Sequence, residues 1–204
     1  IDIFRSESHD LTDHHIWQDV LRQVRNRTYH AILMSLPCAT FSLARQLKGG
    51  PNPLRGEHPP HCYGLPDLSI DDKEKVRIAN LLAIRAAQLA SLATEMHIPW
   101  ICENPQIREG APSLFKLSEW VQIHAEPTVN SGNTPQCPFA DTPLRLPSLT
   151  FTKGTTFVGN VPLHGLLRVC RHPSASWHFS NGSSVHRPHP PLRGREVAAT
   201  APSA

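Results

Sequence analysis

A cysteine and a glutamate, each placed directly after a short apolar run, are the residues of this chain best suited to chemistry. Cys38 follows the run 29–34 and precedes the turn-forming Thr-Phe-Ser of residues 40–42. Glu103 follows a second run, residues 98–102. A thiolate that adds to C6 of a pyrimidine makes C5 nucleophilic, and an acid near N3 makes that addition easier. A thiol and a carboxylate at neighbouring strand ends are what this reaction needs.

Cys38 considered alone would be weaker evidence for a catalytic site. The common alternative for a free cysteine at a strand end is a buried and inert side chain. The pairing of Cys38 with Glu103 favours chemistry, because we expect both apolar runs to be strands of one α/β sheet. Ligands of open α/β sheets bind at the edge where the strands end.

A helix and a long loop are expected around the first of these strands. Apolar residues recur at helical spacing within residues 15–26, and the Thr-Asp pair at 12–13 offers a cap. Residues 49–66 are rich in Gly, Pro and His and should form a loop. Loops of that length without structure of their own are usually functional or disordered.

A second, longer helix is expected between the two strands. Ser69 or Asp71 can cap it, and its apolar stripe, rich in small alanines, continues to about Met96. Strand, crossover helix and strand form a βαβ unit, so we expect the two strands to be parallel. Three tryptophans are expected to be core or hinge residues and not platforms for stacking of bases: Trp17, Trp100 and Trp120.

The character of the chain changes after residue 125, because 11 of the 20 prolines lie there and the apolar periodicity weakens. We expect an α/β core over residues 1–125, an irregular Pro-rich extension over 126–173 and a disordered tail over 174–204. Within the extension, residues 149–157 could form a strand and residues 163–169 a short helical turn.

Composition restricts the class of protein. The chain has 204 residues and a net charge of +3, which permits contact with nucleic acid without arguing for it. Its five cysteines form no regular framework, so we expect free thiols in a reducing, intracellular compartment, nuclear in a eukaryote and cytoplasmic otherwise. We expect neither a signal peptide nor a membrane span, and no feature predicts a protein partner. Because the chain begins at Ile1, we interpret it as a fragment or a processed product.

Two motifs resemble those of DNA cytosine-5 methyltransferases. Residues 37–42 (Pro-Cys-Ala-Thr-Phe-Ser) resemble the Pro-Cys-Gln-x-Phe-Ser motif of that family, and residues 103–105 (Glu-Asn-Pro) resemble its Glu-Asn-Val motif. Residues 9–11 precede the first helix, where the family places an acidic strand end. The resemblance covers about residues 8–107 and includes looser relatives in mobile elements and phages. It implies a partial, Rossmann-like methyltransferase sheet.

The resemblance implies a role for each matching residue. Cys38 would be the nucleophile on a flipped-out cytosine, and Pro37 would shape its loop. Glu103 would contact N3 and the exocyclic amine, with Asn104 ordering the loop of the glutamate. Ser42 would contact phosphate or backbone. Extruding the base would cost a few kcal/mol of unstacking.

The resemblance also implies S-adenosylmethionine as the cofactor and DNA as the partner. Asp10 and Leu11 would lie at its adenine, while Arg45, just after the cysteine loop, is the best candidate for a phosphate contact. The chain departs from the family at Ala39, which replaces Gln, and at Pro105, which replaces Val. The Gly-rich cofactor motif is absent from the sequence, which we interpret as truncation before the first cofactor strand.

Two other functions stay open at this point. One is an inactive, mobile-element-derived fragment with at most nonspecific binding of nucleic acid through its arginines. Most arginines of the chain, Arg55 included, are expected simply to lie on the solvated surface. The other is a zinc-dependent nucleic-acid binder, although structural zinc sites usually have tightly spaced ligand pairs. Its possible ligands are Cys137, Cys170, His172 and His178, with His58 and Cys62 as a further pair.

Overall fold

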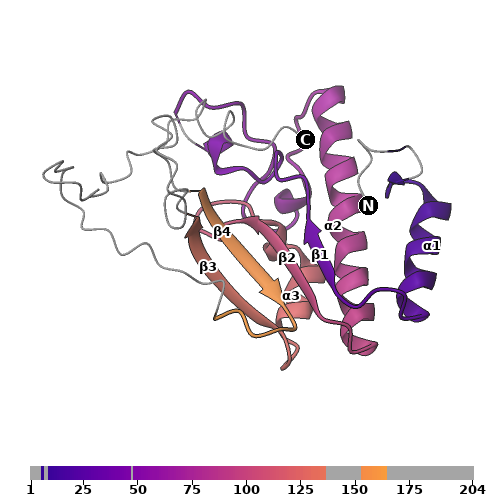
Figure 1. The fold of residues 1–204 in the computed structure, drawn as a ribbon. Helices are drawn as coiled ribbons and strands as arrows, with labels where there is room; N and C mark the ends of the chain where they lie inside the picture. The colour runs from indigo at the N-terminus through magenta and orange to yellow at the C-terminus, as the bar shows by residue number, and fades with distance from the viewer. Residues whose placement is uncertain (1–5, 7–8, 47, 137–152, 165–204) are drawn as a thin grey trace, which may run out of the picture.

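A four-stranded mixed sheet with helices packed against it forms the centre of the fold (Figure 1). The computed structural model describes residues 6, 9–46, 48–136 and 153–164. In chain order the strands and α-helices are α1 (His14–Arg25), β1 (Ile32–Ser35), α2 (Ile70–Glu95), β2 (Trp100–Pro105), α3 (Ser118–His124), β3 (Asn130–Gln136) and β4 (Lys153–Gly159). Short 3-10 turns are η2 (Leu43–Gln46), η3 (His61–Tyr63) and η4 (Leu114–Lys116).

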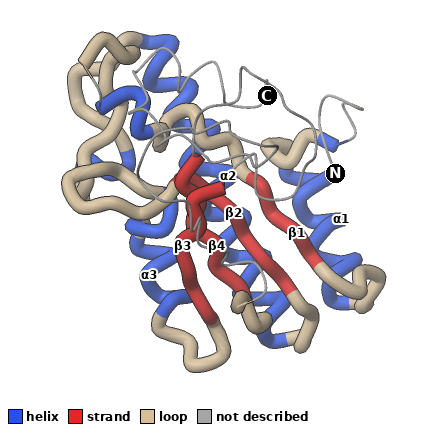
Figure 2. The backbone as a smooth tube through the Cα atoms, turned by 60° about the vertical axis from the view of Figure 1, so that its left-hand side comes forward, coloured by secondary structure: helices blue, strands red, loops and turns tan. Residues whose placement is uncertain are grey.

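The strand order is β1-β2-β4-β3, and only the first pair is parallel. β1 and β2 are joined through α2, so the predicted βαβ unit is confirmed. β4 runs antiparallel to both of its neighbours, and Figure 2 shows it between β2 and β3. The fold is therefore mixed α/β, as expected, whereas a Rossmann-like sheet stays a prediction.

Side-chain caps explain where the two long helices begin. Asp13 accepts hydrogen bonds from the backbone N–H of His15 (2.7 Å) and of Ile16 (3.1 Å). Ser69 accepts one from the N–H of Asp72 at 3.1 Å. These bonds satisfy N–H groups that have no partner inside a helix. Both helices begin and end within a residue or two of the predicted bounds.

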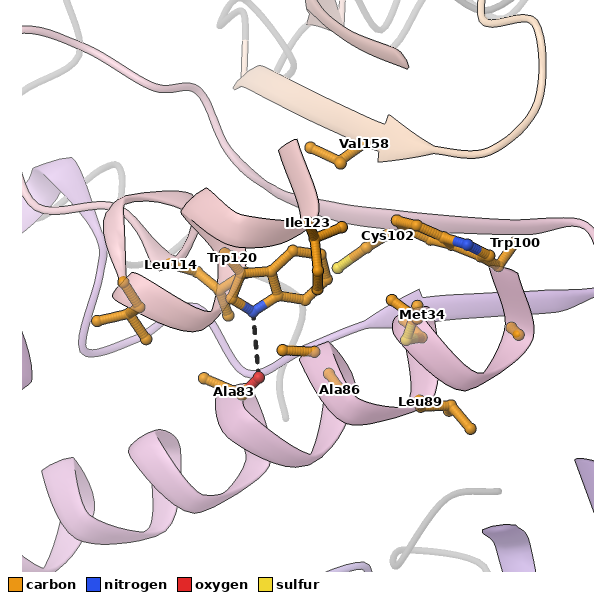
Figure 3. Close-up of a cluster of buried hydrophobic side chains, with 14 of the residues drawn as sticks. Met34, Ala83, Ala86, Leu89, Trp100, Cys102, Leu114, Trp120, Ile123 and Val158 are labelled. Atoms are coloured by element: carbon orange, nitrogen blue, oxygen red, sulfur yellow. Dashed lines mark hydrogen bonds between the residues drawn. The ribbon is translucent and has the colours of Figure 1, made fainter. Parts of the chain in front are cut away.

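The core lies between the sheet and the helices α2 and α3 (Figure 3). Trp120 of α3 is fully buried and donates its Nε1–H to the carbonyl oxygen of Ala83 on α2 at 3.1 Å. Its ring meets those of Phe115 and Trp100 edge to face, with centroids 5.2 and 6.3 Å apart. All three tryptophans are buried, which confirms the first of the two expected places, the core.

Within the extension expected to be irregular after residue 125, residues 130–136 form β3, where no strand was predicted, and residues 153–159 form β4, which overlaps the strand expected over 149–157. β3 contains Gly132 and Pro135, which disfavour strands in the interior of a sheet. It lies at the edge, where a proline without an N–H is tolerated. The sheet thus continues across the boundary set at residue 125, while the predicted tail over 174–204 lies outside the described residues.

β4 lies so close to β2 that one of its positions requires glycine. A Cβ on Gly159 would come within 2.4 Å of the carbonyl oxygen of Trp100. No ordinary contact is that short, so a side chain here would force the two strands apart. The glycine that weakens the strand pattern in the sequence is thus what permits this strand pairing.

α2 deserves comparison with a membrane span because it is the one helix in the described part of the chain that is long and apolar enough to cross a bilayer. Half of its most apolar window is buried inside the fold. Its alanines pack against β2 and α3 (Figure 3). The apolar character of α2 is thus accounted for by its place in the core.

The packing around Trp120 generates a stability prediction. Trp120→Ala should lower the free energy of unfolding by about 3–5 kcal/mol, because it removes a buried ring and leaves a cavity. Val121→Ala is the control, since Val121 is 54% exposed on the same helix and should change stability by less than about 0.5 kcal/mol. Urea denaturation measures both, and equal effects of the two substitutions would contradict this description of the core.

A second prediction concerns pH. Among the described residues the Nε2 of His124 is buried without a hydrogen-bond partner, and burial lowers the pKa of this histidine below its ordinary 6.5. As the pH falls below 6.5, His124 binds a proton in the unfolded chain before it does so in the folded chain. The free energy of unfolding that is present above that pH is therefore lost as the pH falls through the lowered pKa. Stability should therefore fall less on acidification in His124→Leu than in wild type. His30→Leu, at an exposed histidine, should behave as wild type.

Candidate active site at the ends of β1 and β2

The carboxylate of Glu103 is held at the end of β1 by a hydrogen bond. In the parallel register Ser35 is the partner of Glu103, and the Ser35 hydroxyl donates to Glu103 Oε1 at 2.8 Å. Ser35 is the last residue of β1, and the chain leads from it directly into the loop of Cys38. The structure thus brings the predicted thiol loop and carboxylate to one edge of the sheet, but Glu103 lies inside β2 and not after the end of that strand, as was expected.

Cys38 begins a tight turn and is the accessible thiol among the described cysteines. The backbone N–H of Phe41 donates to the carbonyl oxygen of Cys38 at 2.9 Å, which closes the turn. Cys38 is partly exposed, whereas Cys62 and Cys102 are both 0% exposed. Burial raises the pKa of both buried thiols, that of Cys102 most strongly. Thiolate chemistry is therefore open to Cys38 and suppressed at the other two.

Asn104 follows Glu103 but lies on the opposite face of the sheet, because successive side chains of a strand alternate. It is 3% exposed, and neither atom of its side-chain amide has a hydrogen-bond partner in the described part of the chain. Glu103 itself lies in β2 and not in a loop, so the expected role of Asn104 in ordering the glutamate stays a prediction that no described contact tests. Pro37, by contrast, is exposed on the approach to Cys38.

The long loop over residues 49–66 is fixed to the cysteine turn by a buried arginine. Arg55 is 2% exposed and donates through Nε to the Thr40 hydroxyl at 3.1 Å. Its guanidinium also lies over the ring of Phe41, 3.9 Å from the centroid. The expectation that Arg55 is a solvated surface residue is therefore wrong: in the interior its donors need protein acceptors, which this turn and the adjacent helix supply.

The same loop is fixed to the segment that follows β2. Lys116 forms an ion pair with Glu57 at 2.5 Å and donates to the carbonyl oxygen of Ala111 at 2.9 Å. The hydrogen bond from Lys116 lowers the pKa of Glu57. Farther along the loop, the Tyr63 hydroxyl donates to Glu119 at 2.8 Å. The loop is thus attached both to the turn that follows Cys38 and to residues that follow Glu103 in the sequence.

Arg45 is engaged by backbone where a phosphate contact was predicted. Its Nε donates to the carbonyl oxygen of Ala39 and its Nη1 to that of Asn52, both at 2.8 Å. These bonds join the cysteine turn to the start of the long loop. Ser42 is the other predicted phosphate contact. Its carbonyl oxygen accepts a hydrogen bond from the N–H of Arg45 at 3.1 Å. Contacts of either side chain to phosphate stay predictions.

The residues predicted to hold the cofactor lie at the entry to α1. Asp10 accepts through Oδ1 from both the N–H and the hydroxyl of Thr12, each at 2.8 Å. The backbone of Leu11 is bound as well, since its carbonyl oxygen accepts from Arg85. Arg85 also donates to the carbonyl oxygen of Asp13 at 3.0 Å, which attaches this segment to α2. Asp10 and Leu11 are thus well ordered and do not lie on a strand.

Metal ligands do not gather in the described part of the chain, where no group of three or more His, Cys, Asp or Glu side chains could hold an ion. His58 and Cys62 are joined by a backbone hydrogen bond of 3.0 Å, but His58 is exposed while Cys62 is buried. The other possible zinc ligands, at positions 137, 170, 172 and 178, lie outside the described residues.

Two residues of this site were not singled out by sequence reasoning. Ser35 could have been found from a predicted strand register, because the last residue of one parallel strand then faces a residue of the next strand. Arg55 was not, because its acceptors come from three separate segments of the chain. A Pro-Leu-Arg-Gly sequence in a polar loop carries no signal that its arginine is buried.

Comparison with known proteins adds no family. No family model matches this chain, and no curated protein or solved structure matches it either. The resemblance to DNA cytosine-5 methyltransferases therefore depends on residues 37–42 and 103–105 and on the place of both segments at one sheet edge.

Exposure of Cys38 generates a labelling prediction. Iodoacetamide should alkylate Cys38 in the native protein at least about tenfold faster than Cys62 or Cys102, since the thiolate is the reactive form and the other two are buried with raised pKa values. Peptide mass spectrometry after timed quenching measures each site, and labelling in urea gives the control in which the three should become similar. Equal native rates would refute the assignment of Cys38 as the accessible thiol.

Proposed function

We propose that this chain carries the nucleophile and the acid of a cytosine-5 methyltransferase-like reaction on DNA, on a sheet of the Rossmann-like type. The observation that supports it most is the 2.8 Å hydrogen bond from Ser35 to Glu103, which holds a carboxylate where β1 leads into the loop of Cys38. The accessibility of Cys38, in contrast to two buried thiols, supports it independently.

In the proposed reaction the Cys38 thiolate attacks C6 of a flipped-out cytosine. The S–C6 bond forms, the C5–C6 π electrons move toward N3, and Glu103 donates a proton to N3 as the charge arrives there. C5 then carries the electron density of an enamine. After C5 has taken up a methyl group, its proton passes to a base and the thiolate is expelled, which breaks the S–C6 bond. N3 returns its proton to Glu103 as the aromatic ring is restored.

S-adenosylmethionine would supply the methyl group as an electrophile. Of its predicted contacts, Asp10 fits the adenine amine, because Oδ1 is bound to Thr12 while Oδ2 has no hydrogen bond in the described part of the chain. Leu11 packs partly buried against the core and can offer only an apolar contact there. The described residues near this edge provide no contact that we can assign to the methionine portion of the cofactor.

An inactive relative is the competing proposal, and one observation favours it. Arg45, the arginine placed best for a phosphate, is bound to two backbone carbonyl oxygens. Such a protein would bind DNA weakly and without sequence preference, with an affinity that falls steeply as salt is raised. It would form no covalent product with a pyrimidine.

Covalent trapping separates the two proposals. With S-adenosylmethionine present, the protein should form a denaturant-stable adduct with duplex DNA containing 5-fluorocytosine, and Cys38→Ser should abolish it. Glu103→Gln should slow the adduct by about a hundredfold or more, because it removes the acid. Glu109→Gln, at an exposed glutamate just beyond β2, is the matched control and should react as wild type. An adduct that persists in Cys38→Ser would refute the assignment of the nucleophile.

Binding of the cofactor is tested separately by calorimetry. We expect S-adenosylmethionine to bind and Asp10→Ala to weaken that binding. Asp67→Ala, at an exposed aspartate just after the long loop, is the control. Absence of binding by this chain, together with salt-sensitive association with DNA and no adduct, would favour the inactive relative.

A further inference from the structure

Arg55 is a buried cation that has no carboxylate partner among the described residues. Its hydrogen bonds go to neutral acceptors, namely the Thr40 hydroxyl (3.1 Å), the Cys62 carbonyl (2.7 Å), the Asn80 side-chain oxygen (2.7 Å) and the Val76 carbonyl (3.4 Å). Burial lowers the pKa of Arg55 to about 10, which reflects the cost of placing its charge there. An apolar side chain would avoid that cost, so the contacts of the guanidinium call for an explanation.

Those contacts divide into two groups. One group is on the cysteine turn, where Nε binds Thr40 and the guanidinium lies over Phe41. The other is on α2 and on η3, through Asn80, Val76 and Cys62. Asn80 is fixed in turn, since its Nδ2 donates to the carbonyl oxygen of Tyr63 at 2.7 Å. Arg55 therefore connects a short turn to the longest helix of the fold.

We propose that Arg55 is a positioning residue that fixes the Cys38–Phe41 turn against α2 and so sets the place of the Cys38 side chain. Its consequence for catalysis rests on the function proposed above, but its effect on the turn does not. Arg55 does not itself touch the reacting atoms in this proposal. It acts through Thr40 and Phe41, two residues of the motif that contains the nucleophile.

The planar guanidinium suits this position better than an ammonium group would. It presents donors in a fixed fork, and its face can stack on an aromatic ring while its edge donates hydrogen bonds. Arg55 uses both properties at once, because the same group that stacks on Phe41 binds acceptors on three segments. A lysine at this position could supply the charge but not this set of directions.

Thr40→Val is the decisive variant, because it resembles threonine in shape and removes only the acceptor that joins Arg55 to the turn. Its matched control is Thr128→Val, at an exposed threonine. Hydrogen exchange measured by NMR reports the turn directly, since the Phe41 N–H closes it on the Cys38 carbonyl. Thr40→Val should speed exchange at Phe41 by at least about fivefold relative to the amides of α2, and Thr128→Val should leave that ratio unchanged.

The second measurement is the rate of adduct formation with 5-fluorocytosine DNA, in Thr40→Val and in Arg55→Lys. Both substitutions should slow adduct formation at least about fivefold, and the positive charge that lysine retains should not restore the rate. Exchange at Phe41 that is unchanged, or that rises only in step with α2, would overturn the positioning role. Faster exchange at Phe41 in a protein whose wild type forms no adduct would uphold that role and refute the proposed function instead.

Discussion

The parallel register of β1 and β2 is the constraint on which the candidate site depends. It makes Ser35 and Glu103 partners across the sheet, so that the serine can hold the carboxylate at the point where the chain enters the cysteine loop. Register in a sheet has a period of two, and a slip by one residue would move Glu103 to the face that packs on the helices. Trp100 and Cys102, buried on that face, make such a slip costly.

The burial of those two side chains depends in turn on α2 and α3. Their packing around Trp120 covers one face of the sheet, while Leu33, on the other face, is 74% exposed. Core and site therefore share β2, with alternate residues serving each. The chemistry proposed for Glu103 is separated by one backbone position from a side chain that is wholly structural.

Sequence reasoning predicted the elements whose signals are local. The caps at Asp13 and Ser69, the apolar stripe of α2 and the two parallel strands all follow from spacing and side-chain type. It did not predict β3, because glycine and proline are acceptable there only at a sheet edge, which is a property of the assembled sheet. The burial of Arg55 was missed for the same kind of reason: its acceptors are brought together only by the fold.

The attachments of the long loop over residues 49–66 have a consequence for how the site comes apart. Arg55 binds the loop beside the nucleophile, and Glu57 and Tyr63 bind it beyond the strand of the acid. Segments joined in this way tend to open as one cooperative unit. Local unfolding of this loop would therefore displace the thiol and the carboxylate together. A substitution in the loop would then abolish the chemistry of the site without a direct contact to either group.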